Sequence, residues 1–181
     1  MNSKSTLKSW IKIETERCKN FRYEVATISN KLGVVLQTIY FDGYSLSSDN
    51  TENYYLFKNN FFAFNPARIN VGSISINDKE KTFIISPMYV VFSTDYPDVI
   101  KWFTKSFIFN QLVKINVFGT VRNSLSKESL LEFPFFNLKQ IYFLKNKIKE
   151  INFLDCYIKN LKSKLNLYKL LRKHYMSKMF L

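Results

Sequence analysis

Apolar and polar residues alternate over short runs in the first half of the chain, which is the pattern of β-strands. Residues 23–29 and 34–41 are rich in β-branched and aromatic side chains, and residues 30–33 between them predict a turn. Residues 54–64 and 82–92 repeat the pattern with turn-forming residues between them. We therefore expect several short strands in a curved, mostly antiparallel sheet.

Helical spacing replaces this alternation after the strands. Asp95 is expected to cap a helix that has Pro97 in its first turn. One face of this helix is apolar, at Ile100, Phe103, Phe107 and Leu112. Ser126 and Ser129 indicate a further helical turn, and residues 130–136 are expected to form a strand that runs into Pro134.

The last part of the chain has the pattern of one long helix. Residues 138–178 contain no Pro or Gly, and apolar residues recur at steps of three and four. Some 40 helical residues span about 60 Å, too long for the preceding domain to cover, so we expect a partner helix. The expected coiled-coil seam is Leu144, Ile148, Ile151, Asp155, Ile158, Leu161, Leu165, Tyr168, Leu171 and Tyr175. Asp155 either fixes the register as a polar seam residue or turns outward.

These patterns together predict a mixed α/β (α+β) fold in two parts. Residues 1–137 are expected to form a domain with a curved sheet and a few helices. Residues 138–181 are expected to form a long dimerisation or spacer helix.

The charge adds a constraint on the binding partner. The net charge is +13, and residues 138–181 hold 11 basic against 2 acidic residues. An excess of this kind favours nucleic acid, an anionic membrane surface or an acidic protein. The chain is 46% hydrophobic with 18 Phe and 11 Tyr, which excludes a disordered protein.

The chain lacks the usual signatures of catalysis. His174 is the one histidine, and its basic neighbours favour a solvated side chain. No GxGxxG, GxxxxGK[ST] or HExxH occurs, the carboxylates are dispersed, and Cys18 and Cys156 belong to no CxxC pair. No apolar run approaches the length of a membrane span. We expect a cytoplasmic, non-catalytic binding protein without a metal site or membrane span.

Two segments carry candidate binding residues. Residues 65–74 (NPARINVGSI) place Arg68 among two Asn and a Ser where the backbone must turn, and residues 85–92 (ISPMYVVF) follow. A positive, hydrogen-bonding turn on a sheet can hold a phosphate oxygen or a base edge. Arg122 stands in a similar context in residues 119–126 (GTVRNSLS). The alternative is that both arginines are ordinary solvated surface residues.

These three segments, with residues 171–180 (LRKHYMSKMF), resemble a known family in their order and approximate spacing. The chain is similar to a target-recognition domain and the following conserved helix of the specificity subunit of a type I restriction–modification (R-M) system. The resemblance implies a subunit that binds DNA, presents an adenine to a partner methyltransferase and has no catalytic residues. Members of that family carry two domains and two antiparallel helices, whereas this chain has one of each. Residues 136–140 also depart from the Pro-rich pattern that opens the family's helix.

The resemblance also implies roles for individual residues. Shared segments cannot encode differing target sequences, so their DNA-binding residues are expected to contact the phosphate backbone or shape the DNA face. These residues are Asn65, Arg68, Asn70, Ser73, Arg122, Asn123, Ser124 and Lys127. Base-reading side chains are expected from other loops, with candidates at Asn30, Lys31, Gln37, Tyr40 and Lys58.

The partners follow from the same resemblance. They are double-stranded DNA, an adenine methyltransferase subunit and a restriction (translocase) subunit. No cofactor is expected in this chain, and S-adenosylmethionine, ATP and Mg are expected on the partner subunits. One domain and one helix imply a homodimer that reads a bipartite, symmetric site. The alternatives are an inactive truncated copy, or an assembly protein whose basic helix binds an acidic partner or RNA.

Overall fold

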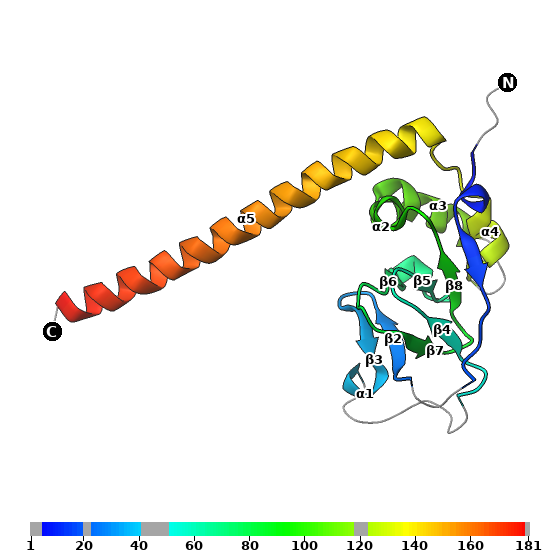
Figure 1. Cartoon of the computed structure of the whole chain (residues 1–181), viewed down its shortest axis with the longest axis horizontal. Helices are drawn as coiled ribbons and strands as arrows, with labels where there is room; N and C mark the ends of the chain where they lie inside the picture. The colour runs from blue at the N-terminus through cyan, green and yellow to red at the C-terminus, as the bar shows by residue number, and fades with distance from the viewer. Residues whose placement is uncertain (1–4, 20–22, 41–50, 118–122, 180–181) are drawn as a thin grey trace. The chain divides into compact units, whose positions relative to one another are not determined.

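The computed structural model describes residues 5–19, 23–40, 51–117 and 123–179 (Figure 1). The chain divides into two compact units, Met1–Asn137 and Leu138–Leu181. The first unit contains η1 (Leu7–Ser9), β1 (Lys12–Glu14), β2 (Val25–Ser29), β3 (Gly33–Leu36), α1 (Gln37–Tyr40), β4 (Tyr55–Phe57), β5 (Phe62–Phe64), η2 (Ile69–Val71), β6 (Ile74–Ile76), β7 (Phe83–Ile85), β8 (Val90–Ser93), α2 (Pro97–Thr104), α3 (Phe107–Val117) and α4 (Lys127–Leu131). The second unit is the single helix α5 (Leu138–Met179).

The strands of the first unit form two four-stranded sheets. The first sheet has the order β1-β8-β5-β6 and is antiparallel throughout. The second has the order β3-β2-β7-β4, and only β2 and β7 run parallel in it. This confirms the predicted mixed α/β fold with mostly antiparallel strands and a long C-terminal helix, although the strands are divided between two sheets.

The first sheet is covered on both faces. Phe62 and Phe64 of β5 belong to the core formed with the helices, in which Phe103 and Phe109 are also buried. Ala63, between them in sequence, belongs to a second core shared with the second sheet. Alternate residues of a strand point to opposite faces of the sheet. All three residues of β5 are buried because the helices cover one face of the first sheet and the second sheet covers the other. The unit is therefore layered as helices, first sheet and second sheet.

Asn77 joins the two sheets at the end of β6. Its side chain is fully buried, and Nδ2 donates to the carbonyl oxygens of Phe57 (2.9 Å) and Lys81 (2.8 Å). Its Oδ1 accepts the N–H of Lys79 at 3.1 Å. A buried amide with all three bonds satisfied fixes the crossing between the sheets, because an unpaired buried group would cost about 1–3 kcal/mol.

The strand predicted for residues 34–41 is too long. It ends at Leu36, and α1 follows directly. Leu36 pairs with Ala26, one residue from the start of β2, so a β3 extended beyond residue 37 would have no β2 residue to pair with its backbone groups. Ile39, expected in the strand, is 70% exposed on α1. The end of the neighbouring strand therefore outweighs the β-propensity of this segment.

The helix predicted after Asp95 is broken into α2 and α3. The residue that precedes α2 is Tyr96 rather than Asp95, and Pro97 occupies the first turn as predicted. Phe103 and Phe109 pack edge to face in one core, with ring centroids 5.5 Å apart. Residues six positions apart on one straight helix point about 120° apart around its axis. The break lets both enter the core, whereas Phe107, predicted for the apolar face, is 76% exposed.

The strand predicted for residues 130–136 is replaced by α4 and an extended segment. Ser126 caps α4 by accepting the N–H of Ser129, which confirms the predicted helical turn. The extended segment makes one antiparallel bridge, between Thr6 and Pro134. Pro134 is tolerated there because its neighbours make the bonds: the N–H of Phe135 donates to the carbonyl of Ser5 at 2.8 Å, and the carbonyl of Phe133 accepts the N–H of Leu7 at 3.0 Å.

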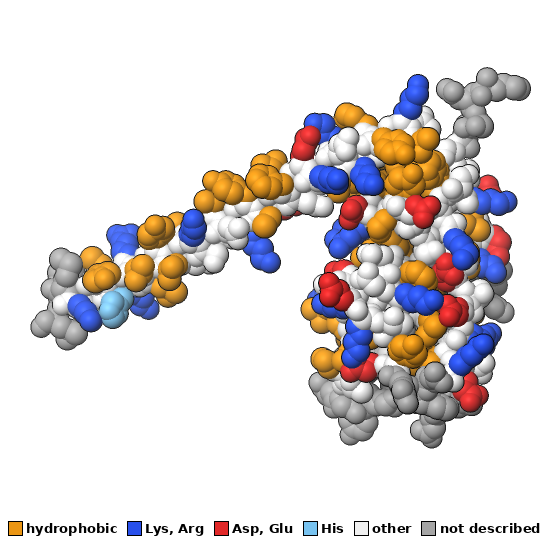
Figure 2. Space-filling model, in the orientation of Figure 1, with side chains coloured by type: hydrophobic (Ala, Val, Ile, Leu, Met, Phe, Trp, Pro, Cys, Tyr) orange, Lys and Arg blue, Asp and Glu red, His pale blue; other side chains and the backbone are white. Residues whose placement is uncertain are grey.

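Helix α5 is continuous over 42 residues, or about 63 Å, which confirms the predicted long helix. Every described side chain from Ile151 to Lys178 is exposed, and apolar and basic side chains are interspersed along the helix (Figure 2). The predicted seam residues in this stretch are among them. Large exposed apolar side chains also lie beside the seam, at Phe153, Leu154, Leu167 and Leu170. Pairing through the seam stays a prediction. None of the described helices has both the length and the apolar character needed to cross a membrane.

Candidate nucleic-acid interface

The loop of residues 65–73 closes the β5–β6 hairpin. The buried Asn65 donates its backbone N–H to the carbonyl of Ser73 at 3.0 Å, and the N–H of Ser73 donates to the carbonyl of Arg68 at 3.2 Å. Gly72 adopts a left-handed conformation (φ 87°) that reverses the chain without strain. Asn65 and Ser73 thus shape the loop, and Arg68 and Asn70 remain exposed on it.

The β2–β3 turn lies against this loop. Ser29 holds the turn, because its Oγ accepts the N–H groups of Lys31 and Leu32, each at 3.3 Å. A Cβ atom placed on Gly72 would lie 3.7 Å from the Cβ of Asn30, which is van der Waals contact. The turn therefore presents Lys31 and Leu32, both exposed, beside the loop that carries Arg68.

A small recess of about 50 Å³ lies between the turn and the loop. Four of the residues predicted to bind DNA line it, and we call it the Arg68 recess: Asn30, Tyr40, Arg68 and Ser73. Its buried wall is fixed by Tyr89, whose hydroxyl lies 3.0 Å from Thr27 Oγ1. Within the described part of the chain Arg68 makes no ion pair. The recess offers a positive charge on a rigid support.

The segment before α4 adjoins the same loop. The N–H of Leu125 donates to the carbonyl of Pro66 at 3.0 Å, which places Asn123 and Ser124 close to the loop of residues 65–73. Asn123 is left-handed (φ 48°), a conformation that asparagine tolerates. Arg122, predicted to bind DNA, lies outside the described residues.

Three other predicted DNA-binding residues do not line the recess. Lys58 follows β4, at the opposite edge of the second sheet from β3, and its Nζ pairs with Glu16 at 2.6 Å. The hydrogen bond from this lysine to Glu16 raises the pKa of Lys58 above its ordinary value. Lys127 opens α4 beside Glu128, with 3.7 Å between the charged atoms. Gln37 belongs to α1, and its Oε1 is buried with no hydrogen-bond partner among the described residues.

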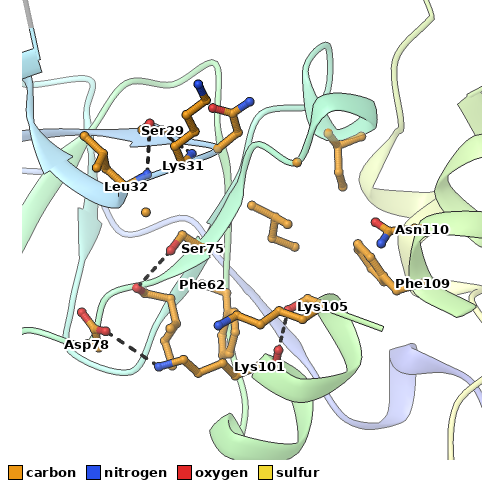
Figure 3. A pocket seen from close by; sticks show the side chains of 17 residues that line it. Ser29, Lys31, Leu32, Phe62, Ser75, Asp78, Lys101, Lys105, Phe109 and Asn110 are labelled. Carbon is orange, nitrogen blue, oxygen red and sulfur yellow. Dashed lines mark hydrogen bonds and ion pairs between the residues drawn. The ribbon is translucent and has the colours of Figure 1, made fainter. Parts of the chain in front are cut away.

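A larger cavity of about 490 Å³ shares Ser29 and Asn30 with the recess (Figure 3). We call it the Lys105 pocket. It lies between the β2–β3 turn, β6 and the α2–α3 junction, and three lysines line it: Lys31, Lys101 and Lys105. Sequence reasoning found Lys31 but missed Lys101 and Lys105, because the break after α2 was not predicted. Ser106 was the available signal, since its Oγ caps α3 by accepting the N–H of Phe109.

Across residues 5–19, 23–40, 51–117 and 123–179, no group of three or more His, Cys, Asp and Glu side chains is placed to hold a metal ion. Cys18 is buried, and Cys156 is exposed on α5.

No protein-family model and no curated protein matches this sequence. The fold is similar to that of a chain in a type I R-M system. That solved structure concerns complex assembly and conformational transition of the system. The TM-score is 0.56 at 13% sequence identity, over 90% of this chain and 43% of the other. This chain thus spans less than half the length of the R-M chain that it matches. At this level of identity the likeness shows a shared fold.

Proposed function

We propose that this chain is a DNA-recognition (specificity) component of a type I R-M complex. The observation that carries the proposal is the shared fold with a chain of such a system, which extends over 90% of this chain. In this role the chain binds double-stranded DNA and selects the site. A partner methyltransferase then modifies an adenine in that site.

The surface around the Arg68 recess supports DNA binding. Arg68 and Lys31 are exposed on neighbouring turns, and both turns are held by internal hydrogen bonds. Cationic side chains on a rigid support suit the phosphate backbone, whose contacts set the position of a protein on DNA. Asn30 and Tyr40 line the same recess and supply the amide and hydroxyl groups that read base edges.

Helix α5 supports assembly into a larger complex. Its exposed apolar side chains extend over most of its length, and an unpaired apolar surface of this size promotes association. In our proposal two copies pair through α5 in antiparallel orientation, and the apolar residues beside the seam contact the methyltransferase subunit. The restriction subunit joins the same complex. S-adenosylmethionine, ATP and Mg bind to those partners, and this chain needs no cofactor.

The charge of α5 favours a second candidate, an assembly protein that binds an acidic partner or RNA. Residues 138–181 hold 11 basic against 2 acidic residues, a larger excess than in the rest of the chain. In this case the lysines of α5 would provide the binding, and no duplex sequence would be preferred.

Duplex selection with the full chain separates the two candidates. We expect affinity for DNA to fall by about tenfold or more between about 50 and 200 mM salt, and one sequence to be enriched from a random duplex pool when the methyltransferase subunit is present. The triple variant Lys162→Gln, Lys164→Gln and Lys169→Gln should keep this preference. Loss of all binding in that variant, with no sequence ever enriched, would favour the assembly protein.

A further inference from the structure

The Lys105 pocket has the features of an anion site. We propose that it binds a phosphate ester, and, if the proposed function holds, that this ester is a phosphodiester group of the DNA backbone. The cavity volume of about 490 Å³ falls within the range of about 300–1,000 Å³ that is usual for small-molecule sites. It therefore has room for a phosphate with part of an attached sugar.

The positive charges come from two separate walls. Lys31 belongs to the β2–β3 turn and Lys105 to the α2–α3 junction, and Figure 3 shows them on different sides of the cavity. Lys101 is paired with Asp78, with 3.7 Å between Nζ and Oδ2. Within the described residues Lys31 and Lys105 make no ion pair. The pocket thus keeps two positive charges that Asp78 does not neutralise.

The neutral lining suits a phosphate oxygen. Asn110 and Ser75 add an amide and a hydroxyl group to the wall. The floor contains Phe62, Ile69 and Phe109, each at most 4% exposed. Buried apolar side chains keep water from one side of the cavity and lower its local dielectric constant. Lys31 and Lys105 are themselves exposed, so the apolar floor reduces the screening of their charges from one side of the cavity only.

The Lys105 pocket lies next to the Arg68 recess, so a phosphate bound in the pocket would help to position DNA at the recess. It shares Ser29 and Asn30 with the Arg68 recess, so one duplex can reach both. A phosphate held between Lys31 and Lys105 would fix the backbone next to Asn30, a candidate base-reading residue. Contacts of this kind set the register in which bases are read.

The test uses the full chain and two readouts. The first is the affinity for inorganic phosphate, measured from changes in backbone amide chemical shifts in NMR spectra during a titration at constant ionic strength. The second is the salt dependence of affinity for a duplex. Lys31→Gln and Lys105→Gln are each expected to weaken phosphate binding by about fivefold, through loss of a charge-assisted hydrogen bond. Each should also reduce the salt slope by about 1. Lys8→Gln is the matched control, because Lys8 is exposed and precedes β1, at the other edge of the first sheet from β6.

The outcomes distinguish a DNA phosphodiester from a free phosphate ester as the ligand of the pocket. Weaker phosphate binding with a shallower slope supports a DNA phosphodiester, and weaker phosphate binding with an unchanged slope supports a free phosphate ester in the same pocket. Phosphate binding that is as strong in both variants as in Lys8→Gln overturns the site, whatever the slope. The proposed function fails separately, if the wild-type chain binds no duplex, because the phosphate titration does not depend on DNA.

Discussion

The double substitution Leu161→Glu and Leu165→Glu is expected to convert a dimer of this chain into a monomer. Both leucines lie on α5 and are 47% and 53% exposed in the single chain. In a paired seam they would be buried, and a carboxylate at such a position costs several kcal/mol unless it is neutralised. Sedimentation equilibrium should give about twice the chain mass of 21.5 kDa for the wild type and 21.5 kDa for the variant.

A matched variant controls for charge. Ser163→Glu with Asn166→Glu also adds two carboxylates, three residues apart rather than four, at positions two residues and one residue from the seam residue Leu165. This variant should remain dimeric, and circular dichroism should show unchanged helix content in both. A wild-type chain that sediments as a monomer at all concentrations would contradict the seam.

The substitution Arg68→Glu is expected to lower affinity for duplex DNA by about 30-fold, since loss of a charge-assisted contact costs about 2 kcal/mol. Arg68 is exposed on a loop whose shape is fixed by Asn65 and Ser73, so the change alters charge without removing a core contact. Fluorescence anisotropy at one salt concentration measures the effect, and the melting temperature should stay unchanged.

Lys8→Glu makes the same change of charge and is the control for Arg68→Glu. Lys8 lies before β1, the edge strand of the first sheet farthest in order from β6. The affinity of the Lys8→Glu variant for DNA should be less than threefold below that of the wild type, as expected for a distant surface charge at physiological salt. Equal losses in the two variants would show that net charge alone controls binding, and the Arg68 recess would have no special role.

Local sequence patterns were sufficient for the elements that depend on nearby residues. The absence of Pro and Gly after residue 137, together with apolar residues at steps of three and four, predicted α5, and β-branched residues predicted β2. The cap at Ser126 was also predicted, because a serine side chain satisfies an N–H three residues later. Each of these depends on contacts within a few positions of the chain.

The end of β3, the break between α2 and α3 and the Lys105 pocket depend on contacts between residues that are distant in sequence. Whether Gln37 continues a strand depends on how far β2 extends, and the break after Thr104 depends on packing of Phe109 against Phe103. The Lys105 pocket joins residues 29–33 to residues 101–110 through that break, so no local pattern indicates it. Candidate residues near the Arg68 recess were found because they follow turn signals that are visible in the sequence.

Helical spacing along α5 offers Leu154 as an alternative to Asp155 in the predicted seam. Leu154 is 55% exposed and lies three residues after Ile151 and four before Ile158. With Leu154 in place of Asp155, the seam still advances in steps of three and four, and all of its positions are apolar. This geometry favours the outward orientation of Asp155 over a polar position within the seam.

The most direct test of the central claim is a map of methylated adenines in the genome that encodes this chain. We predict that methylation falls within one bipartite, palindromic sequence, because two identical recognition units would read its halves. It should disappear when the gene is deleted and return when the gene is restored. Methylation that is unchanged by the deletion, in a cell with an active type I methyltransferase subunit, would contradict a role in DNA recognition.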